Sequence, residues 1–454
     1  MEHILLEYRV NEPTWFYLSF LLIVAVFFKF SRLWSMRNLD LALLLVITPG
    51  LLLIEKERAT GYTWLFATSG LLLIRSLLDG VLVRRPRRET NMNAAGMTFL
   101  CAATFVFLTT KVLTEPPPPS LSAPVRQISA SSEQSAIVTV ASHVTEAPTT
   151  LGPASPLITA PVVQLSRATT GQWDVDIVAS RTLVILAHLS VVIGLILVGY
   201  HLFTDVEMGV AMGTMYMLLP CTSHDVAMQG MAFHVLPAAL IVWAIWAYRR
   251  PMLSGTFIGV ACGILFFPIF LLPLWCAFYG WRGTLRFLGA VALVAGVLVA
   301  GQLLMTSDAH SFLRQTLGYL DSKELQFGAE AGAAGFWQVH HAAYRIPVFA
   351  TYVLMLLALV IWPHRKNLAN LIGHSAAIVI GIQFWYLQQN GAFVLWYLPL
   401  MILLMFRPQL AQHGAPSIEP LLRNRAGGTV VPEQSMMAGF TRSWEKWSVR
   451  SHSG

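Results

Sequence analysis

A small group of polar side chains separates two apolar stretches near the middle of the chain. It comprises Thr222, Ser223, His224, Asp225 and Gln229. A carboxylate beside a histidine raises the pKa of the imidazole and fixes its tautomer, which prepares the pair for general acid–base catalysis. The alternative is a solvated loop in which the aspartate caps the following helix. We predict that His224 and Asp225 are catalytic and that Gln229 contacts the substrate.

A second polar segment, residues 306–345, combines charged side chains and histidines with aromatic residues. Arg314 and Arg345 could pair bidentately with a phosphate, because the guanidinium fork matches phosphate oxygens. His340 and His341 are further candidates for this phosphate site. The alternative is a solvated loop.

Aromatic side chains in the same segment suggest a second kind of contact. Trp337 or Tyr319 could stack on a sugar face or on an isoprenoid, or could be interfacial aromatics only. The adjacent pair His340–His341 does not predict a metal site, because neighbouring side chains on a helix diverge and no carboxylate lies at ligand spacing. The sequence also contains no P-loop and no dinucleotide-binding glycine pattern. We therefore predict no metal, no tightly bound cofactor and no nucleic-acid partner.

The composition places these residues in a membrane protein. The chain of 454 residues is 56% hydrophobic and only 12% charged, with a mean hydropathy of +0.61. Soluble globular proteins carry about 25% charged residues. Continuous apolar runs recur along the chain, so the fold class is predicted to be all-α, a polytopic bundle of about 11 to 13 spans in the lipid bilayer.

The apolar runs give the positions of the predicted spans. They lie near residues 15–28, 39–54, 62–78, 94–108, 183–202, 209–219, 231–247, 255–267, 269–279, 285–305, 346–362, 370–386 and 393–406. The first run lacks a basic segment before it, so it is predicted to be a retained span and not a cleaved signal peptide.

Basic residues lie in alternate loops between these spans, which is the pattern of cytoplasmic loops. The basic positions are Lys29, Arg32, Arg37, Arg84, Arg85, Arg87, Arg88, Arg249, Arg250, Arg282, Arg286, His364, Arg365, Lys366, Arg407, Arg423 and Arg425. They fall on one side only if residues 255–279 form two short helices that reverse near Pro268. The predicted location is the plasma (inner) membrane, with the N-terminus outside and the C-terminus in the cytoplasm.

Four regions follow from this topology. Residues 1–113 form a four-span N-terminal membrane module. Residues 114–180 form an external insert, rich in Pro, Ser and Thr, that is expected to be disordered because it has too little apolar surface to bury. Residues 181–406 form the larger membrane module, with its external loop at 306–345, and residues 407–454 form a cytoplasmic tail.

Several residues inside the spans have a structural interpretation. Gly255, Gly259 and Gly263 have the spacing of closely packed membrane helices. His234 lies within an apolar run and is expected to make an interhelical hydrogen bond. Asp40 and Arg75 form an intramembrane pair or lie at span ends and extend toward the surface.

The order of these segments resembles a known group of enzymes. A polar loop with His, Asp and Gln is followed by "YRRPMLSG", "GVACGILFFPIFLLPLWCAFYGWRG", and then "FLRQTLGY" and "GFWQVHH" in the second external loop. This pattern is similar to bacterial integral-membrane glycosyltransferases of the GT-C type, especially the polyprenol-phosphate-dependent mannosyltransferase-like group. The resemblance covers roughly residues 183–406.

The resemblance implies a hexosyltransferase with an external active site. Its donor substrate would be a polyprenyl-phosphate-linked sugar and its acceptor a lipid- or polymer-linked glycan. A carboxylate base would deprotonate the acceptor hydroxyl, and cationic groups would hold the departing phosphate. Asp225 or His224 would take the acid–base or positioning role, and Arg314, His340, His341 and Arg345 would hold the phosphate.

The chain departs from that group in one respect, since no clear acidic signature lies in an early external loop. Glu55, Glu57, Asp174 and Asp176 are alternative bases. The N-terminal four-span module also matches the group poorly. Two other functions therefore stay open: a transporter or flippase of a lipid-linked substrate, and a non-catalytic protein of cell-envelope assembly.

Overall fold

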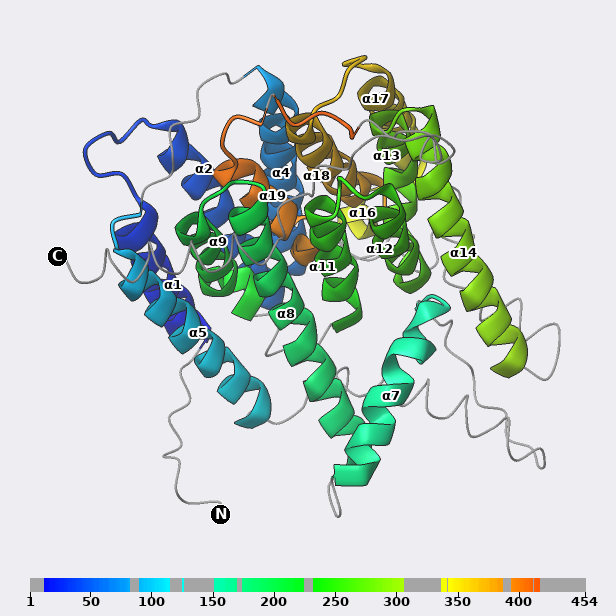
Figure 1. Cartoon of the computed structure of the whole chain (residues 1–454). Helices are drawn as coiled ribbons and strands as arrows, with labels where there is room; N and C mark the ends of the chain where they lie inside the picture. Colours follow the sequence, from blue (N-terminus) through cyan, green and yellow to red (C-terminus); the bar gives the residue numbers. More distant parts are fainter. Residues whose placement is uncertain are drawn as a thin grey trace, which may run out of the picture. The chain divides into compact units, whose positions relative to one another are not determined.

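A computed structural model of the chain describes residues 12–81, 90–114, 125, 151–169, 174–223, 232–305, 336–340, 342–386, 393–410 and 412–416. Residues Met1–Pro416 belong to one compact unit and Ser417–Gly454 to another. Most of the described residues are helical and none lies in a strand, so the all-α prediction is confirmed for this part of the chain (Figure 1).

The first half of the chain forms the following helices. They are α1 (Glu12–Phe27), α2 (Met36–Leu45), α3 (Ile47–Lys56), α4 (Arg58–Leu77), η1 (Leu78–Gly80), α5 (Ala94–Thr114), α7 (Ala154–Thr169), α8 (Val175–His201) and α9 (Val206–Leu218).

The second half of the described chain begins at residue 232. Its helices are α11 (Ala232–Trp246), α12 (Pro251–Ile264), η2 (Phe267–Leu271), α13 (Leu272–Phe278), α14 (Trp281–Met305), α16 (Phe336–Val339), η5 (Ala342–Tyr344), α17 (Arg345–Ile361), α18 (Leu368–Trp385), η6 (Val394–Trp396) and α19 (Leu398–Phe406). Every predicted span contains one of these helices or a pair of them.

Polar residues before the apolar runs define several helix starts. The side chain of Asp205 accepts a hydrogen bond from the backbone N–H of Met208 at the start of α9. The side chain of Asn367 accepts one from Asn370 at the start of α18. Such caps satisfy backbone donors that have no partner within the helix. Short polar connections can therefore separate apolar helices without leaving their ends unpaired.

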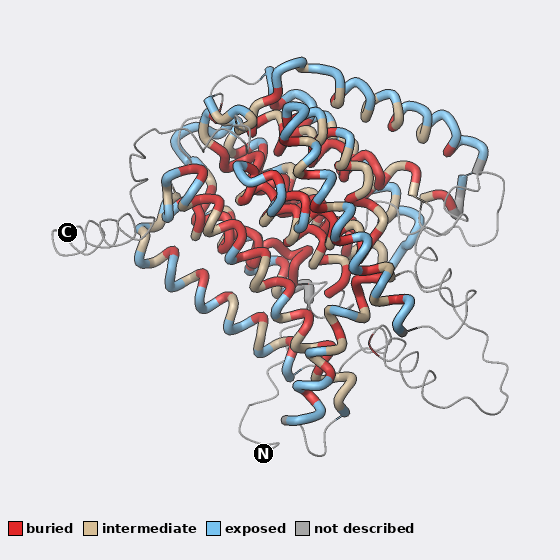
Figure 2. Tube along the Cα trace, turned by 45° about the vertical axis from the view of Figure 1, so that its right-hand side comes forward, coloured by how far each residue is buried: buried red, intermediate tan, exposed pale blue. Residues whose placement is uncertain are grey.

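Among the described residues, five helical segments are long and apolar enough to cross a membrane. They are Met36–Ile54, Ala94–Thr114, Val175–His201, Trp281–Leu304 and Leu368–Trp385. Only 28% of the α14 segment is buried within the protein, whereas 83% of the α18 segment is buried. Helix α18 therefore belongs to the core of the bundle, and α14 exposes apolar side chains such as Leu293 and Leu304 at its edge (Figure 2).

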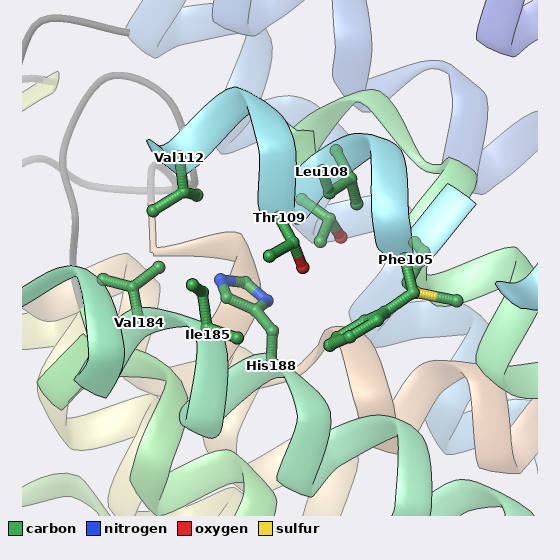
Figure 3. Close-up of a pocket in the computed structure, with 9 residues that line it drawn as sticks. Phe105, Leu108, Thr109, Val112, Val184, Ile185 and His188 are labelled. Atoms are coloured by element: carbon green, nitrogen blue, oxygen red, sulfur yellow. The ribbon is translucent and has the colours of Figure 1, made fainter. Parts of the chain in front are cut away.

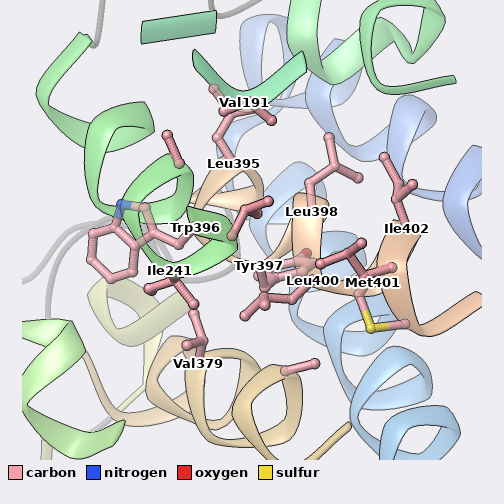
Figure 4. Packing of buried hydrophobic residues seen from close by; sticks show 14 of the residues in the cluster. Val191, Ile241, Val379, Leu395, Trp396, Tyr397, Leu398, Leu400, Met401 and Ile402 are labelled. Carbon is pink, nitrogen blue, oxygen red and sulfur yellow. The ribbon is translucent and has the colours of Figure 1, made fainter. Parts of the chain in front are cut away.

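Helix α19 also lies in the core. All of its residues, Leu398–Phe406, are buried. Figure 4 shows Leu398, Leu400, Met401 and Ile402 among buried side chains from other parts of the chain, including Val379 of α18. A helix that is apolar on every side is expected to be enclosed by other helices.

Helices of the predicted N-terminal module pack against helices of the predicted C-terminal module. Helix α4 packs against α18, and α5 packs against α9. The indole N–H of Trp15 on α1 donates to the Ser223 hydroxyl over 2.5 Å. The first four predicted spans therefore share one core with the later helices, because their buried faces meet α9 and α18.

The predicted disordered insert at 114–180 also contains ordered structure. Residues Ala154–Thr169 form α7, and α8 begins at Val175. Thr159 and Ser155 on α7 are buried, and the backbone N–H of Gly152 donates to the Ile264 carbonyl. The Pro, Ser and Thr content of this segment concealed a helix that packs against α8 and α12.

A chain of buried charges joins the start of the bundle to its last helix. Arg75 of α4 pairs with Asp40 of α2, with 2.6 Å between Nε and Oδ1, and with Asp79 of η1, with 3.0 Å between Nη1 and Oδ1. Arg407, which follows α19, donates from Nε and Nη2 to the other oxygen of Asp79. The four side chains have no net charge together and are at most 7% exposed. The predicted pairing of Asp40 with Arg75 is confirmed.

Arg407 keeps its positive charge in this buried setting. Burial, with Arg75 nearby, lowers the pKa of the Arg407 guanidinium to about 10, and the guanidinium remains protonated at neutral pH. The same region brings basic loops together, because the Leu368 N–H donates to the His413 carbonyl and His413 lies near Arg249. The loops after α4, α11, α17 and α19 therefore meet at one end of the bundle.

We expect Arg407→Met to destabilise the protein strongly, because it leaves an excess negative charge buried. Removing one partner of a buried ion pair costs about 3–5 kcal/mol. The double variant Asp79→Asn/Arg407→Met leaves a neutral site and should recover part of this loss. Thermal unfolding in detergent measures both, with the exposed Arg365→Met as the control. Equal melting temperatures for Arg407→Met and Arg365→Met would contradict the proposed role of the chain.

The glycines of α12 allow it to approach α14 closely, as predicted. A Cβ atom at Gly255 would lie 2.4 Å from the carbonyl oxygen of Phe287, and one at Gly263 would lie 2.4 Å from Leu298 Cδ1. Gly289 on the exposed face of α14 has no atom within 4 Å of such a position. The two types of glycine site therefore provide a matched comparison.

We expect Gly255→Ala to lower the free energy of unfolding by about 1–3 kcal/mol, because the methyl group forces two backbones apart. Gly289→Ala should change it little. The measurement is thermal unfolding of both variants in the same detergent. If Gly255→Ala were as stable as the unchanged protein, the close approach of α12 and α14 would be wrong.

Candidate functional site

The described part of the central polar loop is structural. Thr222 donates its hydroxyl to the Tyr216 carbonyl over 2.6 Å, and Ser223 donates to the Pro220 carbonyl over 3.0 Å. Both side chains are buried. They hold the chain at the end of α9, immediately before the predicted catalytic pair. His224, Asp225 and Gln229 themselves lie outside the described residues.

A small cavity lies beside this turn, between α5, α8 and α9 (Figure 3). Its volume is about 20 Å³, and Thr222 and His188 are among its lining residues. Such a space holds one water molecule. The Nδ1 atom of His188 lies 2.9 Å from the Tyr216 hydroxyl, within hydrogen-bond distance. The cavity is too small for a sugar, so we assign it no substrate.

Two of the alternative bases, Asp174 and Glu57, contact groups at helix starts. Asp174 caps α8, since its carboxylate accepts from the backbone N–H groups of Asp176 and Ile177. Glu57 accepts a hydrogen bond from the Thr60 hydroxyl over 3.0 Å. These contacts account for helix ends and give no sign of a shared site. The side chain of Glu55 lies outside the described residues.

Residues of the second polar segment gather at the C-terminal end of α18. The indole N–H of Trp337 donates to the Phe384 carbonyl over 3.0 Å, and the Trp337 side chain is buried. Phe336 stacks on Phe66 of α4 with 4.0 Å between ring centroids. His340 is exposed, and its ring centroid lies 4.3 Å from that of Phe336.

Arg345 lies at the next carbonyl of α18. Its Nε and Nη2 atoms donate to the Trp385 carbonyl over 3.1 and 3.0 Å, and its side chain is 0% exposed. A cation at this position pairs with the last carbonyls of a helix and with the negative end of its dipole. Arg345 therefore fixes the start of α17 to the end of α18, whatever further contact it makes.

The structure thus brings Trp337, His340 and Arg345 to one helix end. Arg314 and His341 lie outside the described residues, so their predicted contacts with a phosphate stay predictions. Among the described residues, no three His, Cys, Asp or Glu side chains are grouped so that they could bind a metal ion.

An apolar groove that was not predicted lies close to these residues in the chain, since Pro347 and Phe384 are among its lining residues. Its volume is about 420 Å³, and it lies between α4, α17 and α18. The lining residues are Gly70, Leu73, Ile74, Pro347, Val348, Thr351, Tyr352, Met355, Gly381 and Phe384. On α17 these recur with helical spacing from Pro347 to Met355, which is a sequence signal that could have indicated a single lining face.

An aromatic cluster at neighbouring helix ends was also not predicted. It comprises His234 of α11, Phe266 and Phe267 near the end of α12, Tyr386 after α18, and Phe393 and Trp396 near η6. These residues are up to 162 positions apart in the chain. No spacing pattern could have grouped them.

The comparisons with known proteins add no relative. The chain matches no protein-family model, and no curated protein or solved structure is significantly similar to it. The chemistry of the site must therefore be argued from its own residues.

Substitutions of Arg345 and His340 are expected to have different effects on stability. We expect Arg345→Ala to lower the melting temperature, because it removes a buried charge and two hydrogen bonds to α18. The exposed His340→Ala should leave the melting temperature unchanged. Thermal unfolding of both variants in detergent tests this. An unchanged melting temperature for Arg345→Ala would show that its contacts with Trp385 contribute little to stability.

Proposed function

We propose that the protein is a membrane-embedded glycosyltransferase of the GT-C type. It transfers a sugar from a polyprenyl-phosphate carrier to a lipid- or polymer-linked glycan on the external face of the plasma (inner) membrane. The observation that carries this proposal is the apolar groove between α4, α17 and α18. Its lining residue Phe384 directly precedes Trp385, whose carbonyl accepts from the buried guanidinium of Arg345.

The groove suits the hydrocarbon part of such a carrier. Apart from Thr351 and the Tyr352 hydroxyl, its lining side chains are apolar. Neighbouring side chains, such as Ile74 on α4 and Leu354 on α17, are more than half exposed, as expected for helix faces in contact with lipid. An isoprenoid chain could therefore enter from the bilayer without crossing a polar surface.

The end of the groove suits the phosphate. Arg345 lies two residues before the lining residue Pro347, and a guanidinium in a low-dielectric setting attracts an anion more strongly than one in water. His340 is exposed nearby and can donate to a phosphate oxygen. Arg314 and His341, from the same external segment, would complete the anion site.

The proposed reaction uses the central polar loop as its base. Asp225, oriented with His224, takes the proton of the acceptor hydroxyl. The acceptor oxygen then bonds to the anomeric carbon, and the bond from that carbon to the phosphate oxygen breaks with inversion. Polyprenyl phosphate leaves with the electron pair, and the cationic groups stabilise its charge.

The membrane orientation belongs to the same proposal. The basic loops that meet around residues 407–414 lie on the cytoplasmic side, and each predicted span crosses the bilayer once. The loops at 219–231 and 306–335 are then external. This places the groove end and the central polar loop on the side where the sugar is transferred.

The groove can be tested with a side chain that fills it. A Cβ atom at Gly70 would meet only Phe384, at 3.9 Å, so the groove has room for a larger side chain there. We expect Gly70→Leu to reduce sugar transfer at least about tenfold, because it occupies the site of the isoprenoid chain. Gly289→Leu, on the exposed face of α14, is the matched control and should retain activity.

The assay uses purified protein in lipid nanodiscs with radiolabelled polyprenyl-phosphate sugars and a membrane-lipid extract as acceptor. Asp225→Ala should abolish the labelled product while the protein remains folded. Full activity of both Gly70→Leu and Asp225→Ala would refute these site assignments. Movement of labelled lipid across the bilayer without a new glycosidic bond would instead identify a flippase.

A further inference from the structure

The aromatic cluster contains a histidine, His234, whose ring position and tautomer are defined by its neighbours. Trp396 lies between two rings, with centroid distances of 4.5 Å to Phe267 and 4.5 Å to Phe393. The His234 ring is nearly parallel to that of Phe393, at an interplanar angle of 1° and a centroid distance of 5.0 Å. The imidazole is thus held by Phe393 and Trp396, which lie in one segment of the chain around η6.

A hydrogen bond determines the tautomer of His234. The indole N–H of Trp396 lies 3.0 Å from His234 Nδ1. An indole nitrogen can only donate, so Nδ1 accepts and the proton of the neutral imidazole resides on Nε2. In the described part of the chain, Nε2 has no hydrogen-bond partner, and the side chain is only partly buried. His234 therefore presents a single N–H donor.

This state limits what His234 can bind. Its one lone pair is already used by Trp396, so it can neither accept a substrate proton nor ligate a metal ion without breaking that bond. A neutral N–H donor beside aromatic rings instead suits a ligand with an uncharged oxygen acceptor and an apolar ring face. Phe266 and Tyr386 add a stacked pair that is only partly buried, with 5.1 Å between centroids.

The position of the cluster indicates which ligand it meets. Three consecutive residues at the end of α18 contact three different environments. Phe384 lines the apolar groove, the Trp385 carbonyl accepts from Arg345, and Tyr386 packs on Phe393 and Phe266. Consecutive Cα atoms are about 3.8 Å apart, so these environments adjoin. Their order is apolar, cationic and aromatic, which is the order of lipid, phosphate and sugar in a lipid-linked sugar.

We propose that this aromatic cluster is the sugar-binding subsite, with the pyranose ring stacked against Phe266 or Tyr386 and one of its oxygens accepting from His234 Nε2. The proposal rests on the glycosyltransferase function proposed above. It adds a binding residue, His234, and a contact surface from four helix ends, of which only Phe266 and Phe267 lie within the sequence motifs.

The chain provides a matched control for His234. At another place in the bundle, the indole N–H of Trp246 lies 3.1 Å from His201 Nδ1, which is also 3.3 Å from the Leu197 carbonyl. His201 is exposed at the end of α8 and is not part of the aromatic cluster. A ligand that recognises the cluster should affect His234 and leave His201 unchanged.

The test is ¹⁵N NMR of histidine-labelled protein in nanodiscs, titrated with methyl glycosides of mannose, glucose and galactose. We expect at least one glycoside to shift the His234 Nε2 resonance saturably, while glycerol, which has no ring face, does not. His234→Asn keeps an acceptor for Trp396, and its shorter side chain withdraws the donor from the position that Nε2 occupies. It should weaken glycoside binding about tenfold, the effect of one lost hydrogen bond, with little change in melting temperature.

Phe393→Leu is the second variant and should also weaken binding, because it removes the ring that stacks on His234 and holds the imidazole in place. His201→Asn should bind the glycoside normally. No shift with any glycoside, or equal binding by the His234 and His201 variants, would overturn the subsite. Glycoside binding without any sugar transfer would retain the subsite and reject the transferase, so the two failures are distinguishable.

Discussion

The buried chain of Asp40, Arg75, Asp79 and Arg407 connects parts of the protein that are far apart in sequence. Burying four charges is costly unless each has a partner of opposite sign, and here the charges alternate. The chain therefore forms fully only when α2, α4, η1 and the end of α19 are all in place. Because Arg407 directly follows α19, this interaction also fixes the position of α19, whose residues are all buried.

The end of α18 connects this charged chain to the candidate site. Helix α18 packs against α4, which carries Arg75, and its last residues contact the groove, Arg345 and the aromatic cluster. Arg345 and Trp337 both donate to its final carbonyl groups, which a helix end leaves without internal partners. The same unsatisfied carbonyls that require capping thus hold Trp337 and Arg345 at the end of α18.

Polar groups in this bundle have two distinct roles. Thr222, Ser223 and Asp174 satisfy backbone groups or helix ends. His234 differs, because one nitrogen is fixed by Trp396 and the other has no partner among the described residues. That contrast separates positions where polarity serves the fold from positions where it is available to a substrate.

The sequence by itself determined the helical class, the positions of the apolar helices and the close packing of the α12 glycines. These features depend on local hydrophobicity and on spacing along one helix. It also paired Asp40 with Arg75 as one of two possibilities. It treated residues 154–169 as disordered, because a helix stabilised by distant partners has little local signal. The groove and the aromatic cluster arise from helix ends that meet only after folding, so the tertiary structure alone decided them.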